Sequence, residues 1–262
     1  MIEYLNETSL LKPIIFDTHA HYDDERFSDY IDSLLSVLPQ KGVGGIITCG
    51  CDLASSKRAL ELAEKYDYIF FAAGIHPCNI EDKDNLSEIE KLFLHKKCVA
   101  VGEIGLDYYW TQDNKDEQKK LFINQLILSK EYNLPVLIHD RDAHSDTLEI
   151  LKEYKPKGVV HSFSGSVEIA EELLKMGLYI GVGGVITFKN ARKLPDVVKM
   201  LPEDRILLET DAPYLAPVPY RSKTNNSSMI YLTAEKIAEI RNTTTEDVLV
   251  STFNNAKKLF DL

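Results

Sequence analysis

Two histidines stand two residues apart directly after the first apolar run of the chain, in the hexapeptide FDTHAH at residues 16–21. Side chains at alternate positions of a strand point to the same face, so His19 and His21 would present two imidazoles to one place. A bound metal ion is one explanation for such a pair, and a chance cluster in a polar loop is the other. The remaining polar residues must decide between them.

Imidazole and carboxylate groups recur where later apolar runs end. Five of the seven histidines stand at such positions, and only His95 and His144 fall elsewhere. A single histidine in an apolar stretch is most often a hydrogen-bonded core residue, but five at equivalent positions favour a metal site. The polar residues at the run ends are Asp17, His19, His21, His76, Glu103, His139, Asp140, His161, Glu209 and Asp211.

Eight apolar runs pass along the chain and predict eight strands. They are continuous rather than alternating, which is typical of parallel strands buried on both faces. Helical patterns fill the gaps, and Ser55 or Ser56 would cap the first of them. The runs lie near 13–21, 43–50, 68–77, 98–107, 134–140, 157–165, 178–186 and 205–213, and the main helical patterns cover 54–66, 116–132, 145–154, 166–177, 232–242 and 245–260.

Eight strands alternating with helices in 262 residues predict a single-domain (β/α)8 TIM barrel over residues 1–262. A doubly wound open sheet is the alternative, and it is disfavoured because no glycine-rich dinucleotide fingerprint follows the first strand. Barrel enzymes build their sites at the carboxyl ends of the strands. The polar residues at the run ends would therefore converge on one rim.

Imidazole and carboxylate ligands without thiolate suit Zn, Mn, Fe, Ni or Mg. The groups are too many for one tetrahedral ion, but two ions that share a bridging carboxylate would use them all. Glu103 is the natural bridge, because the fourth strand lies between the first strand and the fifth and sixth. A two-ion site lowers the pKa of a bound water and holds the attacking and leaving oxygens of a hydrolysis.

Composition narrows the class of protein. The net charge of −11 argues against a protein that binds nucleic acid non-specifically through a basic surface. Bound divalent ions would still allow the protein to bind one or two phosphates. No apolar run approaches the ~20 residues of a membrane span, and the first thirteen residues lack the pattern of a signal peptide. We therefore expect a cytoplasmic protein without membrane association. The cysteines, interpreted as buried and reduced, are Cys49, Cys51, Cys78 and Cys98.

Six motifs, in order, make the chain resemble the TatD family of metal-dependent deoxyribonucleases, within the amidohydrolase-like barrels. A lone H-x-H pair would be weak, but the ordered set extends from about residue 14 to 217. The resemblance implies removal of nucleotides from the 3′ end of DNA with divalent ions, commonly Mg²⁺. The motifs are FDTHAH, GIHP (74–77), VGEIGLDYY (101–109), PVLIHDRDAHSDTLEIL (135–151), HSFSGS (161–166) and LLETDAPYLAP (207–217).

The resemblance also implies a role for each residue. His76 would contact the substrate phosphate or assist proton transfer, and Asp211 would be the base that orients the attacking water. Related barrels often bridge their ions with a carboxylated lysine, so Glu103 favours the TatD branch. One ion would be held by His19, His21, Glu103 and Asp211, and the second by Glu103, His139 and His161.

Two loops leave alternatives open. Family members usually carry Arg-Gly and then Asn-Glu-Pro after the eighth strand, whereas this chain has Arg221-Ser222 and then asparagines at 225 and 226. Because this loop would lie over the barrel mouth, its divergence leaves the substrate preference undecided. Arg221 would either hold a phosphate or be solvated. After the fourth strand, Tyr108, Tyr109 and Trp110 would either stack on bases or pack over the barrel rim.

The leading hypothesis is a metal-dependent deoxyribonuclease with two divalent ions (Mg, Zn, Mn or Ni) that acts on single-stranded DNA or 3′ ends. The alternative is hydrolysis of another ester or amide at the same site, such as an aminoacyl ester on tRNA or a cyclic amide. A third hypothesis is a metal-binding barrel that serves as a partner-binding scaffold and catalyses no reaction. The sequence does not distinguish DNA from RNA and gives no indication of oligomeric state.

Overall fold

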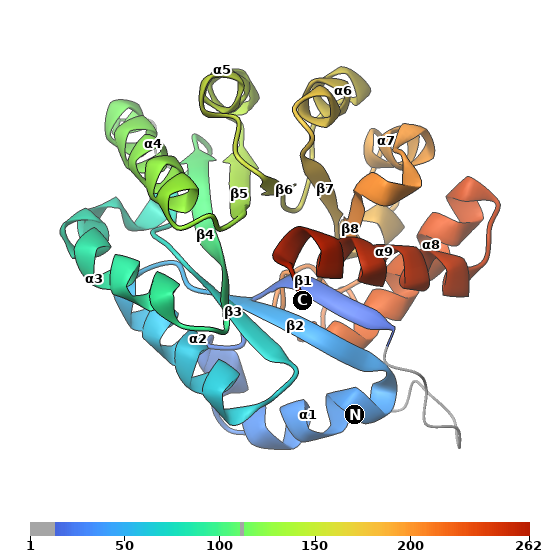
Figure 1. The fold of residues 1–262 in the computed structure, drawn as a ribbon. Coiled ribbons are helices and arrows are strands. Elements are labelled where there is room, and N and C mark those ends of the chain that lie inside the picture. Colours follow the sequence, from blue (N-terminus) through green and yellow to red (C-terminus); the bar gives the residue numbers. More distant parts are fainter. Residues whose placement is uncertain (1–13, 111–112) are drawn as a thin grey trace.

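The computed structural model describes residues 14–110 and 113–262. The thirteen residues on which the expectation about a signal peptide depends lie outside this part. One eight-stranded parallel sheet runs in the order β1 to β8 and curls into a nearly closed barrel with helices around it (Figure 1). Each strand pairs with its sequence neighbour, which confirms the predicted (β/α)8 barrel and excludes the reversed strand order of a doubly wound sheet. Among the described helices, none is long and apolar enough to cross a membrane.

The elements follow the predicted runs closely. The strands are β1 Ile15–Ala20, β2 Val43–Cys49, β3 Ile69–Ala73, β4 Cys98–Asp107, β5 Val136–Arg141, β6 Gly158–Val160, β7 Tyr179–Val182 and β8 Ile206–Leu208. The α-helices are α1 Ile31–Val37, α2 Leu53–Lys65, α3 Leu86–Glu90, α4 Lys115–Glu131, α5 His144–Tyr154, α6 Val167–Lys175, α7 Leu194–Met200, α8 Ile230–Arg241 and α9 Thr245–Phe260.

The last three strands are shorter than the apolar runs that predicted them. Two residues just beyond β6 and β8 show why, because Ser162 (φ 43°) and Asp211 (φ 57°) have left-handed backbone conformations. A β ladder requires φ near −120°, so the chain leaves the sheet before these residues. His161 and Asp211 therefore stand on short loops at the rim rather than inside strands.

The cap of α2 differs from the prediction. Asp52 is the N-cap, and its carboxylate accepts the backbone N–H of Ser55 at 2.7 Å. The Ser55 hydroxyl accepts the Asp52 N–H in return at 2.9 Å, which completes a capping box. The prediction of a serine cap was wrong because the helix begins a turn earlier, and Ser55 occupies the third helical position.

The barrel has an apolar interior that is covered at one end by α9. Inward-facing residues of the strands, such as Ile47 and Leu137, form one buried cluster with Phe260 of α9. The ring of Phe16 packs between Phe253 and Phe260 at centroid distances of 5.9 and 6.5 Å. In Figure 1, α9 crosses the barrel in dark red. Polar chemistry is thereby confined to the opposite end, where the strands terminate.

The barrel closes between β8 and β1 largely through side chains. In the part of the chain that the structure describes, the backbone of this seam forms an isolated bridge between Ala20 and Ala212, where the N–H groups of His21 and Asp211 donate to carbonyls of the opposite segment. Asp17 supplies the missing connections: its carboxylate accepts the Thr210 N–H at 3.0 Å, the Thr210 hydroxyl at 2.7 Å and the Ser227 hydroxyl at 2.6 Å. Burial raises the pKa of Asp17 to about 6, against these hydrogen bonds.

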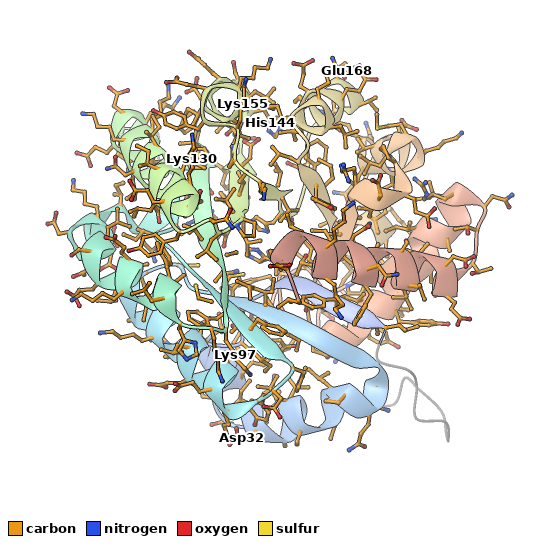
Figure 2. All side chains as sticks on the ribbon, viewed as in Figure 1. Asp32, Lys97, Lys130, His144, Lys155 and Glu168 are labelled. Atoms are coloured by element: carbon orange, nitrogen blue, oxygen red, sulfur yellow. The ribbon has the colours of Figure 1, made fainter. Side chains whose placement is uncertain are left out.

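We expect Asp17→Ala to lower the free energy of unfolding by about 3 kcal/mol, because several buried donors would lose their acceptor at once. A urea titration should show a lower midpoint with an unchanged slope. Asp32→Ala is the control, since Asp32 is an exposed carboxylate on α1 (Figure 2). Equal midpoints for the two variants would contradict the role of Asp17 in closing the barrel.

Candidate metal centre

The carboxyl ends of the strands bring the histidines and carboxylates of the sequence motifs into one cluster. His19 comes from β1, and His21 follows it by two residues. Glu103 lies within β4, and His139 within β5. The other members follow their strands within three residues: His76 after β3, His161 after β6 and Asp211 after β8. His95 and His144 stand apart from the cluster, paired with Glu64 and Asp140, and Figure 2 shows His144 out by α5.

Glu103 lies at the centre of the cluster, with one carboxylate oxygen turned to each side. Its Oε2 lies 3.3 Å from His19 Nε2 and 3.5 Å from His21 Nε2. Its Oε1 lies 2.7 Å from both His139 Nδ1 and His161 Nε2. A single carboxylate thus separates two sets of imidazole nitrogens, which is the arrangement expected of a bridging ligand.

Each side of Glu103 gathers further donor atoms. On the β1 side, Asp211 Oδ1 lies 3.3 Å from His21 Nε2, and the Nε2 atoms of His19 and His21 are 3.2 Å apart. On the β5 side, His139 Nδ1 and His161 Nε2 are also 3.2 Å apart. Ligand atoms of His19, His21 and Asp211 all lie within 4.8 Å of one another, as do those of His19, Glu103 and His161. The spacing suits small ions on both sides.

Hydrogen bonds away from the centre determine which nitrogen each ring presents to it. His21 Nδ1 lies 3.0 Å from the Cys49 carbonyl, which can only accept, so in the neutral ring Nδ1 carries the hydrogen and Nε2 presents a lone pair. His139 Nε2 lies 3.0 Å from Asp107 Oδ2, which leaves Nδ1 facing the centre. Partners of this kind orient metal-binding histidines.

His76 is oriented in the opposite sense. Its Nδ1 accepts the backbone N–H of Cys78 at 3.1 Å, so in the neutral ring Nε2 carries the hydrogen. That Nε2 lies 3.5 Å from Glu103 Oε1. Burial lowers the pKa of His76 to about 3, so the ring is neutral. His76 therefore presents an N–H donor to the cavity, whereas His21 and His139 present lone pairs there once they have lost a proton.

The buried charges depend on one another. Burial by itself raises the pKa of Glu103, but His161, His76 and His19 outweigh it and hold the pKa well below its usual range. Burial lowers the pKa of His19 to about 4, so that ring is a neutral donor of a lone pair. His139 loses basicity to burial but gains more from Asp107 and Glu103, and its pKa rises to about 9. An ion bound there would displace a proton.

The residues fit divalent metal ions. Glu103 is only 3% exposed, and in residues 14–110 and 113–262 its ion-pair partners are histidines, with no lysine or arginine among them. A buried carboxylate needs opposite charge nearby; here protons on His21, His139 and His161, whose pKa values are raised, supply that charge, and divalent ions would take the place of these protons. Imidazole nitrogen and carboxylate oxygen are the donors of hydrolytic metal sites.

The sequence prediction overlooked Asp107, the last residue of β4. Its Oδ2 faces His139, while its Oδ1 accepts the backbone N–H groups of Tyr109 and Trp110 at 2.9 and 3.0 Å. Gly105 allows β4 to run this close to β5, because a Cβ at its φ of 145° would overlap the carbonyl oxygen of His139. The strand-end rule that picked out the other polar residues would have found Asp107 as well.

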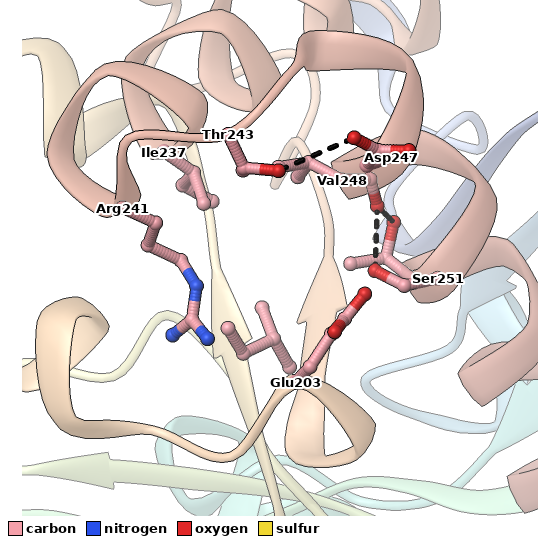
Figure 3. A pocket seen from close by; sticks show the side chains of 9 residues that line it. Glu203, Ile237, Arg241, Thr243, Asp247, Val248 and Ser251 are labelled. Atoms are coloured by element: carbon pink, nitrogen blue, oxygen red, sulfur yellow. Dashed lines mark hydrogen bonds between the residues drawn. The ribbon is translucent and has the colours of Figure 1, made fainter.

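We expect Asp107→Asn to weaken divalent metal binding by about 10- to 100-fold, because an amide cannot hold the His139 ring as the carboxylate does. Competition with a chromogenic chelator measures this affinity. Asp247→Asn is the matched control on α9; Asp247 lines a different pocket (Figure 3) and does not line the cavity of the metal centre. Unchanged affinity in Asp107→Asn would mean that Asp107 only anchors the loop after β4.

The cysteines agree with the prediction only in part. Cys49 and Cys98 are buried, whereas Cys51 and Cys78 are half-buried and line the cavity above the centre. Cys51 Sγ lies 3.8 Å from both His21 Nδ1 and Glu103 Oε2. The interpretation of all four as core residues was therefore wrong for two of them. Burial raises the pKa of Cys51 to about 11, so its thiol remains protonated.

The centre opens into a cavity of about 950 Å³. Arg58, Trp110, Arg141 and Tyr214 are among the side chains that line it. Arg221, predicted to contact substrate, is not among them, and its guanidinium carbon lies 3.6 Å above the Phe188 ring. A smaller cavity of about 120 Å³ between α8 and α9 holds Thr243 and Asp247, joined by a hydrogen bond (Figure 3), and gathers no histidine.

Known proteins resemble the chain over nearly all of its length. The model of the family described as TatD related DNase matches residues 16–261. The uncharacterized metal-dependent hydrolase YabD of Bacillus subtilis is 44% identical over 252 residues, which cover 94% of this chain and 99% of the relative. The uncharacterized metal-dependent hydrolase YcfH of Escherichia coli is 36% identical over 254 residues, which cover 95% of this chain and 96% of the relative.

Solved structures give the same result. YjjV, a TatD homolog of Escherichia coli, superposes with a TM-score of 0.89 at 34% identity and covers 95% of this chain and 99% of its own. A TatD family hydrolase of Entamoeba histolytica has a TM-score of 0.84 at 26% identity, with 96% and 99% covered. The likeness extends to the complete barrel and includes the segments that form the metal centre.

Proposed function

Because the chain belongs to the TatD family of metal-dependent hydrolases, we propose that it is a deoxyribonuclease that hydrolyses DNA phosphodiester bonds from the 3′ end. The position of Glu103 carries the proposal, with one carboxylate oxygen toward His19 and His21 and the other toward His139 and His161. This arrangement suits two ions held by a common ligand, as in many enzymes that cleave phosphodiesters.

The ring orientations support the ligand roles that we propose. His19, His21, Glu103 and Asp211 would hold one ion, and Glu103, His139 and His161 the other. Two divalent ions in these places supply positive charge for the phosphodiester and lower the pKa of water. The protein holds the ligands rigidly, because Cys49 and Asp107 hydrogen-bond the outer nitrogens of His21 and His139.

Two side chains act on the substrate and the attacking water. Asp211 orients the water and accepts its proton, and its side chain is 19% exposed toward the cavity. Burial raises the pKa of Asp211, but contact with His21 lowers it more, so the carboxylate is ionised and able to accept. His76 presents its Nε2–H to a phosphate oxygen, because its Nδ1 is occupied by the Cys78 N–H.

The test is cleavage of a 5′-labelled single-stranded DNA by the protein with Mg²⁺, with Mn²⁺ or with a chelator. We expect a ladder that shortens from the 3′ end, is formed with either ion and is absent with chelator. Immediate release of the labelled terminal nucleotide would contradict the 3′ direction. Discrete internal fragments would indicate an endonuclease at the same site.

The alternative function has its own outcome. Bound metal without cleavage of any DNA would contradict the proposal and direct attention to other esters and amides, such as an aminoacyl ester on tRNA or a cyclic amide. In that case the segment after β8, with Arg221 turned onto Phe188, is where substrate choice would differ from that of DNA-cleaving relatives. Turnover of none of these substrates would favour a metal-binding scaffold.

A further inference from the structure

Two large aromatic side chains stand exposed at the mouth of the metal-centre cavity. Tyr109 is 54% exposed and Trp110 is 65% exposed, directly after β4, the strand that carries Glu103. Trp110 lines the cavity together with His139 and Arg141. The Tyr109 and Trp110 rings meet edge to face, with centroids 4.9 Å apart. Rings that only packed over the barrel rim would be covered, and these are not.

Arg141, the last residue of β5, completes the group. Its guanidinium carbon lies 4.0 Å from the Tyr109 ring centroid and 5.5 Å from that of Trp110. Among the described residues no carboxylate forms an ion pair with Arg141, whereas Arg58, also at the cavity, is 3.4 Å from Asp23. Arg141 thus retains its charge and free N–H donors beside two ring faces, the combination that binds a nucleotide phosphate next to a stacked base.

The group is fixed relative to the metal centre. The same Asp107 carboxylate that faces His139 accepts the backbone N–H groups of Tyr109 and Trp110. Arg141 follows His139 by two residues on β5, and its partner across the β4–β5 ladder is Asp107. One carboxylate therefore links the aromatic residues to a ligand of the centre, so a base on the rings would be held at a constant position from the bond to be cut.

We infer that Tyr109, Trp110 and Arg141 form a nucleotide platform, on which an unpaired base of the substrate stacks while Arg141 holds the adjacent phosphate. The inference rests on the proposed nuclease function and adds residues that select for an unpaired base. The platform supplies binding rather than chemistry. Its loss therefore raises KM and leaves kcat unchanged.

Trp110 is the only tryptophan of the chain, so tryptophan fluorescence, excited at a wavelength that tyrosine does not absorb, reports on the platform alone. The probe is a short oligothymidylate with phosphorothioate linkages, which resist hydrolysis, added to the protein with Mg²⁺. Its matched partner is the same backbone with abasic sites. We expect quenching by the oligothymidylate and about tenfold weaker binding of the abasic strand, since stacking of one base contributes about 1–3 kcal/mol.

Variants separate stacking from structure. Trp110→Ala should weaken oligothymidylate binding about tenfold, as measured by anisotropy of a labelled strand, and leave cleavage of an abasic strand as in the wild type. Trp110→Phe should restore most of the affinity. Tyr231→Ala is the control, because it removes another partly exposed ring that does not line the cavity. It should change neither the affinity for oligothymidylate nor the cleavage of the abasic strand.

The outcomes distinguish the platform from the proposed function. DNA cleavage without quenching, or with an unchanged KM in Trp110→Ala, overturns the platform and leaves the nuclease proposal intact. Quenching without cleavage of any strand overturns the nuclease proposal, and the platform with it as a part of a nuclease. If Trp110→Ala weakens binding and cleavage of abasic and normal strands equally, the platform is also overturned. Such an equal effect would arise only from a structural role of Trp110.

Discussion

Glu103→Ala is expected to reduce kcat for DNA cleavage by about a thousandfold or more, and to lower bound metal at both positions together. The reason is geometric, since one oxygen of Glu103 faces His19 and His21 and the other faces His139 and His161. Metal ions contribute several kcal/mol to such transition states, and each 1.36 kcal/mol corresponds to about a tenfold rate change.

The bridging role of Glu103 is tested by comparing Glu103→Ala with variants that remove a ligand on one side of the centre only. His19→Ala removes a ligand on the β1 side and His161→Ala one on the β5 side, so each should lower metal content and kcat less than Glu103→Ala. His144→Ala is the control, because this histidine pairs with Asp140 away from the centre. Metal content by mass spectrometry and kcat should be measured on the same samples. A Glu103→Ala protein that keeps its metal and turnover would show that the bridge has been misassigned.

Asp211→Asn is expected to lower kcat by about 10²- to 10⁴-fold, the range of general-base catalysis, while retaining more metal than Glu103→Ala. The amide keeps an oxygen that can still face His21, 3.3 Å from the present carboxylate, but it cannot accept a proton from water. The left-handed backbone of Asp211 (φ 57°) tolerates asparagine well, so the variant should fold as the wild type does.

Single-turnover kinetics with saturating metal measure this effect directly. Unchanged single-turnover rates in Asp211→Asn would exclude Asp211 as the base. Loss of metal equal to that in Glu103→Ala would mean that Asp211 serves as a ligand only. Asp247→Asn, on α9, provides an Asp-to-Asn change that should alter neither quantity.

The barrel could be predicted from the sequence because its strands are buried on both faces. Continuous apolar stretches such as 43–49 and 98–107 are required wherever a parallel strand lies between a core and covering helices. The strand-end rule then identified the clustered histidines and carboxylates, since parallel strands all end on the same rim. Where the chain departs from the ladder, as at Ser162 and Asp211, apolar content no longer marks the boundary.

The amino-acid sequence by itself determined the eight-stranded barrel, the rim on which His19, His21, His139 and His161 meet, and the central place of Glu103. These follow from local patterns, namely apolar periodicity and residue type at the strand ends. Only the tertiary structure decided that Asp107 orients His139, that Cys51 borders the centre, and that Arg141 lies over Tyr109 while Arg221 lies over Phe188. Such contacts depend on side-chain directions between different strands and loops, and spacing along the chain does not encode them.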